Sequence, residues 1–102
     1  MREIVKRPRA KDDLKGIWRY TFDEWGEAQA DKYLAEIEAK LARLKSNPHL
    51  GRPREDVRAG YRSLRVNQHV VYYIVTPSVI RVIRVLHSQM EPDRHLSNTG
   101  DE

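Results

Sequence analysis

The spacing of apolar residues along the chain changes near residue 8 and again near residue 60. Residues 2–7 have a β-branched centre of Ile4 and Val5 and end before Pro8, which favours extended backbone in the residue that precedes it. Proline at such a position also suits the first turn of a helix. The pattern therefore predicts a first strand over residues 2–7, with a helix directly after it.

Beyond Pro8, apolar and aromatic residues recur at steps of three and four, the spacing of one face of an α-helix. Gly26 ends the stretch, as a left-handed glycine cap does. Burial in the core is the first interpretation of these aromatic side chains. Two tryptophans and a phenylalanine nevertheless exceed what a thin sheet can cover, so we expect part of the face to remain free for a partner helix. The face consists of Leu14, Ile17, Trp18, Thr21, Phe22 and Trp25.

A second amphipathic helix follows Gly26 and is stopped by Asn47 and Pro48. Two helices joined by a short turn form an antiparallel hairpin, whose apolar stripe must be covered by a sheet. The stripe on this second helix consists of Ala30, Tyr33, Leu34, Ile37, Leu41 and Leu44.

The last part of the chain has the pattern of strands. Residues 48–60 contain several prolines and glycines and are expected to form an exposed loop. Runs rich in Val, Ile and Tyr come next, separated by the turn-forming pairs Asn67-Gln68 and Pro77-Ser78. The predicted strands are Tyr61–Val66, His69–Thr76 and Val79–Leu86.

Together these elements predict an α+β fold: a strand, a two-helix antiparallel hairpin and a three-stranded antiparallel meander, with the hairpin packed on one face of an antiparallel sheet. A chain of 102 residues supports one core and a shallow groove rather than a deep cofactor pocket. Residues 1–90 are predicted to form the domain. Residues 91–102 form an acidic tail, and we expect the chain from Ser88 onward to be mobile in isolation.

Charge is distributed unevenly along the chain, which has 19 basic and 15 acidic residues and a net charge of +4. Residues 12–47 carry six basic and eight acidic residues, whereas residues 51–65 carry five arginines and two acidic residues. Four arginines lie on the predicted strands: Arg62, Arg65, Arg81 and Arg84. They could bind phosphates or acidic side chains, or they could be the solvated outer face of an antiparallel sheet.

Several kinds of site are absent from the sequence. There is no cysteine, no paired metal-ligand spacing among the four histidines, no Gly-rich phosphate loop and no Ser-His-Asp arrangement. We therefore expect neither a metal nor a cofactor. The N-terminus has no apolar run, so we expect a cytoplasmic protein. His87 could act as an acid or base if a substrate crossed the sheet, or simply bond to backbone at a strand end.

Several strings in this chain resemble, in order and spacing, those of ParE-type toxins of the RelE/ParE toxin–antitoxin superfamily, over roughly residues 4–90. The strings are Pro8–Leu14, Ile17–Tyr20, Trp25–Gly26, Gln29–Tyr33, Pro48–Pro53, Gly60–Ser63, His69–Tyr73 and Arg84–His87.

The resemblance implies a strand, two-helix, three-strand fold and a cognate ParD-like antitoxin. The disordered C-terminal segment of such an antitoxin is expected to wrap the toxin, with a helix against apolar surface and a strand added to a sheet edge. The expected partner-binding residues are Trp18, Phe22, Trp25, Tyr33, Arg62, Arg65, Arg81 and Arg84.

The resemblance leaves the target open. Relatives of the ParE type imply non-enzymatic inhibition of DNA gyrase, which we favour. RelE-like relatives imply metal-free cleavage of mRNA, for which Arg62, Arg65, Arg84 and His87 are the candidate catalytic residues. The C-terminal tyrosine typical of RelE-like nucleases is absent, and His95, a conceivable substitute, lies in the predicted tail. A third possibility is a module that binds antitoxin without being toxic.

Overall fold

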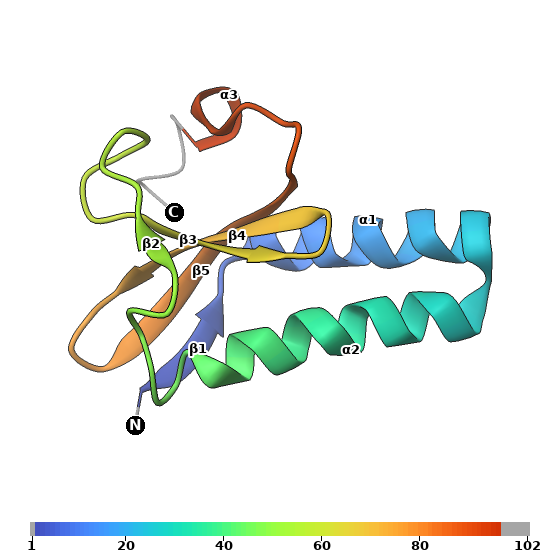
Figure 1. Ribbon diagram of the computed structural model, residues 1–102, viewed down its shortest axis with the longest axis horizontal. Coiled ribbons are helices and arrows are strands. Elements are labelled where there is room, and N and C mark those ends of the chain that lie inside the picture. The colour runs from blue at the N-terminus through green and yellow to red at the C-terminus, as the bar shows by residue number, and fades with distance from the viewer. Residues whose placement is uncertain (1, 97–102) are drawn as a thin grey trace.

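The computed structural model describes residues 2–96 and has the predicted α+β architecture (Figure 1). Two long helices form a hairpin beside a five-stranded sheet, and a short third helix follows the last strand. No helix in the described range is long and apolar enough to cross a membrane. The elements are β1 (Glu3–Lys6), α1 (Pro8–Trp25), α2 (Glu27–Arg43), β2 (Arg52–Pro53), β3 (Arg62–Val66), β4 (His69–Val75), β5 (Val79–His87) and α3 (Pro92–Leu96).

The strand order is β1-β5-β4-β3-β2, and the meander β3–β5 is antiparallel as predicted. The prediction of a wholly antiparallel sheet is wrong, because β1 pairs with β5 in parallel. The helical hairpin returns the chain to the end at which β1 starts, and three meander strands then leave β5 running alongside β1. The loop 48–60 also contains a short strand that was not predicted, β2, which pairs antiparallel with β3.

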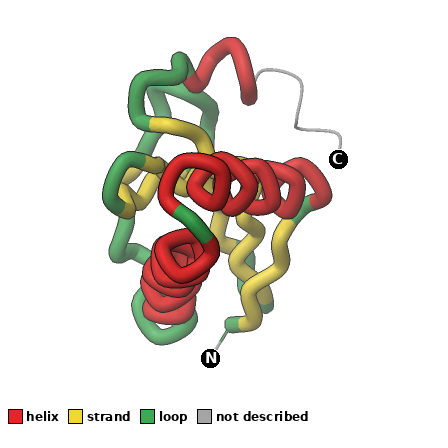
Figure 2. The backbone as a smooth tube through the Cα atoms, turned by 90° about the vertical axis from the view of Figure 1, so that its right-hand side faces the viewer, coloured by secondary structure: helices red, strands yellow, loops and turns green. Residues whose placement is uncertain are grey.

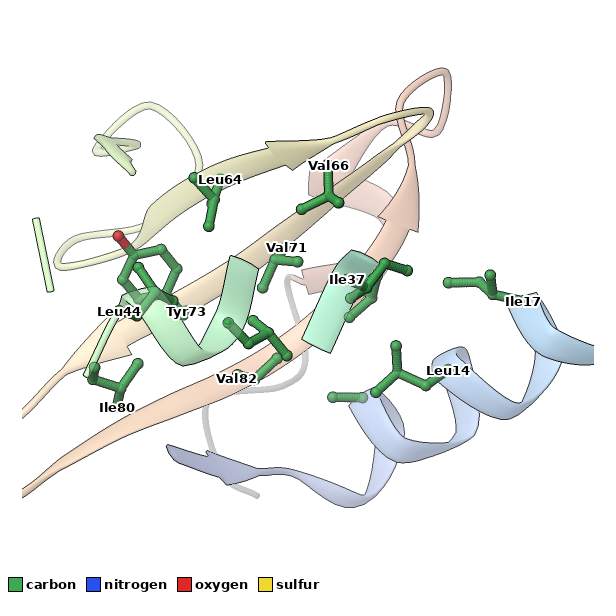
Figure 3. Packing of buried hydrophobic residues seen from close by; sticks show 13 residues of the cluster. Leu14, Ile17, Ile37, Leu44, Leu64, Val66, Val71, Tyr73, Ile80 and Val82 are labelled. Atoms are coloured by element: carbon green, nitrogen blue, oxygen red, sulfur yellow. The ribbon is translucent and has the colours of Figure 1, made fainter. Parts of the chain in front are cut away.

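The main core lies between the hairpin and one face of the sheet. Figure 2, which looks along the hairpin, shows both helices beside the strands. In Figure 3, Leu14 and Ile17 of α1 and Ile37 of α2 point toward Val71 and Val82 of the sheet. The three- and four-residue spacing of the helices and the alternation of the strands thus meet in one apolar layer, as the patterns predict.

The loop that precedes β2 is anchored to this core through Tyr73. The Tyr73 hydroxyl donates to the carbonyl of Pro48 at 2.8 Å and accepts from the N–H of Gly51 at 2.9 Å. A Cβ atom at Gly51 would lie 2.5 Å from the Ser63 carbonyl oxygen, so only glycine fits there without displacing backbone. These contacts hold the Pro48–Gly51 turn against β3 and β4.

The hairpin extends well beyond the sheet (Figure 1). An 18-residue helix is about 27 Å long, which exceeds the width of sheet available to cover it. The distal aromatic residues of α1 are therefore exposed, with 38% of Phe22 and 71% of Trp25 accessible to solvent. The prediction that the sheet leaves part of this aromatic face uncovered is confirmed at the end of α1 that precedes Gly26.

The opposite face of the sheet carries a second, smaller apolar cluster: Tyr61, Tyr72, Ile83, Leu86 and Leu96. Leu96 is only 1% exposed and belongs to α3. The expectation of a mobile tail from Ser88 onward is therefore wrong for residues 92–96, because Leu96 gives this segment an apolar anchor. The rest of the expected tail, residues 97–102, lies outside the described residues.

Candidate partner-binding site

A difference in strand length creates an open sheet edge beside α1. Strand β1 has four residues and pairs only with Val79–Val82 of the nine-residue β5, after which Arg7 N–H bonds to the Val82 carbonyl. From Ile83 onward, β5 has a neighbouring strand on one side only, within the described residues. Helix α1 runs beside this edge and contacts it through Asp13.

Asp13 of α1 occupies part of the open edge. Its carboxylate accepts from the backbone N–H of Val85 at 2.9 Å and from Nε and Nη2 of Arg84 at 2.8 and 2.9 Å. Arg84 also donates to the carbonyl of His95 at 3.0 Å, which ties α3 to the same point. The Asp13–Arg84 pair therefore joins α1, β5 and α3, and the Arg84 guanidinium is largely engaged within the chain.

Beyond Asp13, an open groove of about 380 Å³ lies between α1 and the end of β5. Its lining is mostly apolar, with Ile17, Val85 and Leu86 beneath and Met90 at one side. Tyr20, which is 67% exposed, connects the groove with the outer surface of α1. An open apolar groove of this size suits side chains of a partner better than an enclosed small molecule.

The polar end of the groove is formed by a histidine pair. His69 of β4 lies opposite His87 of β5 in the strand register, and their rings meet edge to face with centroids 5.4 Å apart. Tyr33 of α2 bonds to His69 Nδ1 at 2.7 Å. Burial, and secondarily the proximity of His87, lowers the pKa of His69 to about 4, so His69 is neutral at neutral pH.

The four strand arginines do not form one cluster, although two of them share an open face. Arg62 lies at the β2 edge and donates to the carbonyls of His49 and Gly51, whereas Arg84 is paired with Asp13. By register, Arg65 and Arg81 lie on the sheet face away from the hairpin, and both are exposed. Only these two share an open face, and they lie toward opposite ends of it.

The aromatic residues expected to bind a partner are placed more favourably. Trp18 stacks on Phe22 with ring centroids 5.1 Å apart and donates to Asp31 of α2 at 2.9 Å, so it is partly used within the hairpin. Phe22 and Trp25 are exposed near the hairpin turn. Tyr33, by contrast, is half-buried, and its hydroxyl is hydrogen-bonded to His69.

Sequence reasoning named His87 but missed most of the other groove residues, among them Asp13, Gly16, Tyr20 and His69. A faint signal was present, since Asp13, Gly16 and Tyr20 follow helical spacing on the side of α1 next to its apolar stripe. No signal connected His69 with Tyr33 or His87, because the three come from separate elements. Among the described residues, no group of three or more His, Asp or Glu side chains could hold a metal.

Comparison with known proteins agrees with this architecture. Residues 4–92 match the family model described as ParE toxin of type II toxin-antitoxin system, parDE. The chain is 42% identical over 90 residues to Toxin ParE1 of Mycobacterium tuberculosis, covering 87% of this chain and 92% of that protein. It is 43% identical over 88 residues to Toxin ParE1 of Caulobacter vibrioides, covering 86% and 91%. Toxin ParE of Escherichia coli is 31% identical over 94 residues, covering 89% of each.

Solved structures share the fold at lower identity. The structure titled "Chromosomal ParDE TA system from P. aeruginosa" superposes with a TM-score of 0.77 at 20% identity, covering 87% of this chain and 98% of that one. The YoeB dimer from Staphylococcus aureus gives 0.62 at 23% identity, covering 84% and 95%. With the family match over nearly the whole described domain, the chain belongs to the ParE toxins of type II toxin–antitoxin systems.

Proposed function

We propose that this chain is a growth-inhibiting toxin that is neutralised by a ParD-like antitoxin and acts by inhibiting DNA gyrase without catalysing a reaction. The observation that supports an antitoxin partner is that α1 leaves apolar and aromatic residues uncovered in two places: Tyr20 beside the groove, and Phe22 and Trp25 near the hairpin turn. Exposed aromatic residues beside an apolar groove are typical of a surface that a partner helix covers. The family match supports a cognate antitoxin as that partner.

The non-enzymatic half is supported by the scatter of the candidate catalytic residues. Attack by a ribose 2′-hydroxyl needs a base, an acid and cations around one phosphate. Arg62 pairs in register with Tyr73, near the opposite end of the sheet from His87, and it points its guanidinium at loop carbonyls. Arg84 is held by Asp13, and Arg65 is exposed and donates to the carbonyl of Asn67 at the β3–β4 turn.

The proposal is tested by assaying the purified chain for inhibition of gyrase supercoiling in parallel with ribosome-dependent cleavage of mRNA. We expect supercoiling to be inhibited, mRNA to remain intact, and supercoiling to recover when the antitoxin encoded beside this gene is added. Cleavage of mRNA without gyrase inhibition, lost in His87→Ala, would instead favour the endoribonuclease.

A growth assay separates the toxin from a non-toxic binding module. Expression of the chain alone is expected to arrest growth, and co-expression of the antitoxin is expected to relieve the arrest. A chain that binds its antitoxin tightly but leaves growth unchanged would be a binding module, and the toxin proposal would then fail.

A further inference from the structure

The proton positions of the histidine pair follow from the bonds made by the two Nδ1 atoms. The N–H of Gln89 donates to His87 Nδ1 at 3.1 Å, so this nitrogen is an acceptor and the proton of the neutral ring lies on Nε2. In His69, Nδ1 is bonded to the Tyr33 hydroxyl, whose oxygen also accepts from the N–H of Gln68 at 3.2 Å. Because the Tyr33 oxygen already accepts the N–H of Gln68, we assign its own proton to the bond with His69 Nδ1. With Nδ1 as the acceptor in each ring, the ring proton of each histidine lies on Nε2.

Both Nε2–H groups are at least partly accessible to solvent. Within residues 2–96, the buried side-chain nitrogen atoms that lack a hydrogen-bond partner are Arg7 Nε and Arg62 Nε. The Nε2 atoms of His69 and His87 have no partner in the same range and are not among these buried atoms, so both are accessible. Because both residues line the groove, it contains two N–H donors in an otherwise mostly apolar lining.

Gly16 adds an independent feature of the same groove. Glycine inside a helix costs about 1 kcal/mol relative to alanine, so such a residue needs a reason to be there. A Cβ atom built at Gly16 has no neighbour within 4 Å, so packing inside the chain does not require glycine at this point of α1. A bare stretch of helix backbone at the wall of the groove lets an outside chain approach α1 closely.

We propose that one apolar segment of the antitoxin crosses α1 at Gly16, fills this groove, and places oxygen acceptors on the Nε2–H groups of His69 and His87. This inference rests on the proposed function, since it gives the position at which the antitoxin binds. The acceptors are neutral oxygens, such as backbone carbonyls or side-chain amides, because the carboxylates of Asp12 and Asp13 also line the groove and would repel a negatively charged group. A second copy of the chain fits less well, because both copies would carry the same net charge of +4.

The first experiment measures antitoxin affinity by calorimetry with the full-length chain and the antitoxin encoded beside it. Gly16→Trp places an indole in the groove and is expected to weaken binding at least 100-fold. Ala35→Trp is the matched control, since it puts the same side chain at an exposed position of α2 outside the groove, and it should bind within about threefold of wild type. Equal binding by Gly16→Trp and wild type would overturn the inference.

The second experiment removes the donors and keeps the ring shape. His87→Phe is expected to weaken antitoxin binding about tenfold, the equivalent of one hydrogen bond. In the free wild-type chain, ¹⁵N shifts should report both rings as Nε2–H tautomers, and the two Nε2–H protons should exchange more slowly in the complex. Unchanged exchange would contradict the proposed contacts even if the variants bind weakly.

The outcomes separate this inference from the function on which it rests. If the wild-type chain does not bind the antitoxin, the proposed function fails and the inference fails with it. If wild type and Gly16→Trp bind the antitoxin equally, the proposed function stands and the proposed binding position in the groove is wrong. If Gly16→Trp abolishes a dimer of the free chain and leaves antitoxin binding intact, the groove is a self-association site and the inference is overturned.

Discussion

The two sides of helix α1 differ in burial. The side formed by Ala10, Leu14 and Thr21 is buried against α2 and the sheet, whereas the side that carries Gly16 and Tyr20 faces the open groove and solvent. Both sides contain apolar or aromatic residues at helical spacing, so composition alone does not distinguish them. The difference arises because β1 is short and leaves part of β5, and the helix beside it, without a covering strand.

This comparison shows that one helix supplies both the core and a surface available for binding. A substitution on the inner side should act on folding, and one on the outer side should act on binding.

Leu14→Ala on the inner side is expected to lower the free energy of unfolding by about 3 kcal/mol, because it leaves a cavity in the main core. Chemical denaturation followed by tryptophan fluorescence measures this change. A loss below about 1 kcal/mol would mean that the inner side of α1 is packed much more loosely than its burial indicates.

Asp13→Asn is expected to cost about 2 kcal/mol, since Arg84 and Val85 lose a charged acceptor in a largely buried place. Asp12→Asn is the matched control, because this neighbouring carboxylate is exposed and should change stability by less than about 0.5 kcal/mol. If the two variants are equally stable, Asp13 does not join α1 to β5 and α3 in the way described.

Gly16→Ala is expected to stabilise the free chain by about 1 kcal/mol, because alanine is the better helix former and its Cβ meets nothing within 4 Å. The melting temperature should therefore rise. If the melting temperature falls instead, an intramolecular contact near Gly16 must restrict this position, and the outer side of α1 would not be free.

Trp25→Ala is expected to leave the free energy of unfolding within about 0.5 kcal/mol of wild type, since 71% of this side chain is already exposed. Affinity for the antitoxin should fall at least tenfold, as for a tryptophan at the centre of an interface. Calorimetry and denaturation on the same preparation separate the two effects. Unchanged affinity would remove the hairpin tip from the proposed interface.

The pH dependence of stability tests the histidine pair. The pKa of His69 falls from 6.5 to about 4 on folding, so the unfolded chain takes up the proton first as the pH drops. The stabilising contribution of neutral His69 is complete above about pH 6.5 and is lost as the pH falls from there to about 4. Stability measured across this window should decline less steeply in His69→Phe than in His49→Gln, which changes an exposed histidine. Identical slopes would show that His69 is not the group responsible.

Much of the fold is predictable because local patterns and burial agree. The helical stripe that contains Ile37 and Leu41 is buried in one arrangement, and the Val-, Ile- and Tyr-rich strand β4 is buried on both faces in the middle of the sheet. The predicted hairpin and meander are therefore confirmed. The parallel pairing of β1 and the burial of Leu96 were missed, because a strand's neighbour and a short segment's anchor depend on residues far away in the chain.

By itself, the sequence determined the elements, the one-domain α+β class and the resemblance to ParE toxins, because helical and strand periodicity are local properties and the family strings are written in residue order. Only the tertiary structure decided which residues share a site. It paired Asp13 with Arg84 across 71 positions and brought Tyr33, His69 and His87 together from three elements. The physical reason is that side-chain contacts between elements follow from strand order and from the packing of the helices on the sheet, and neither is encoded by the residues of any single segment.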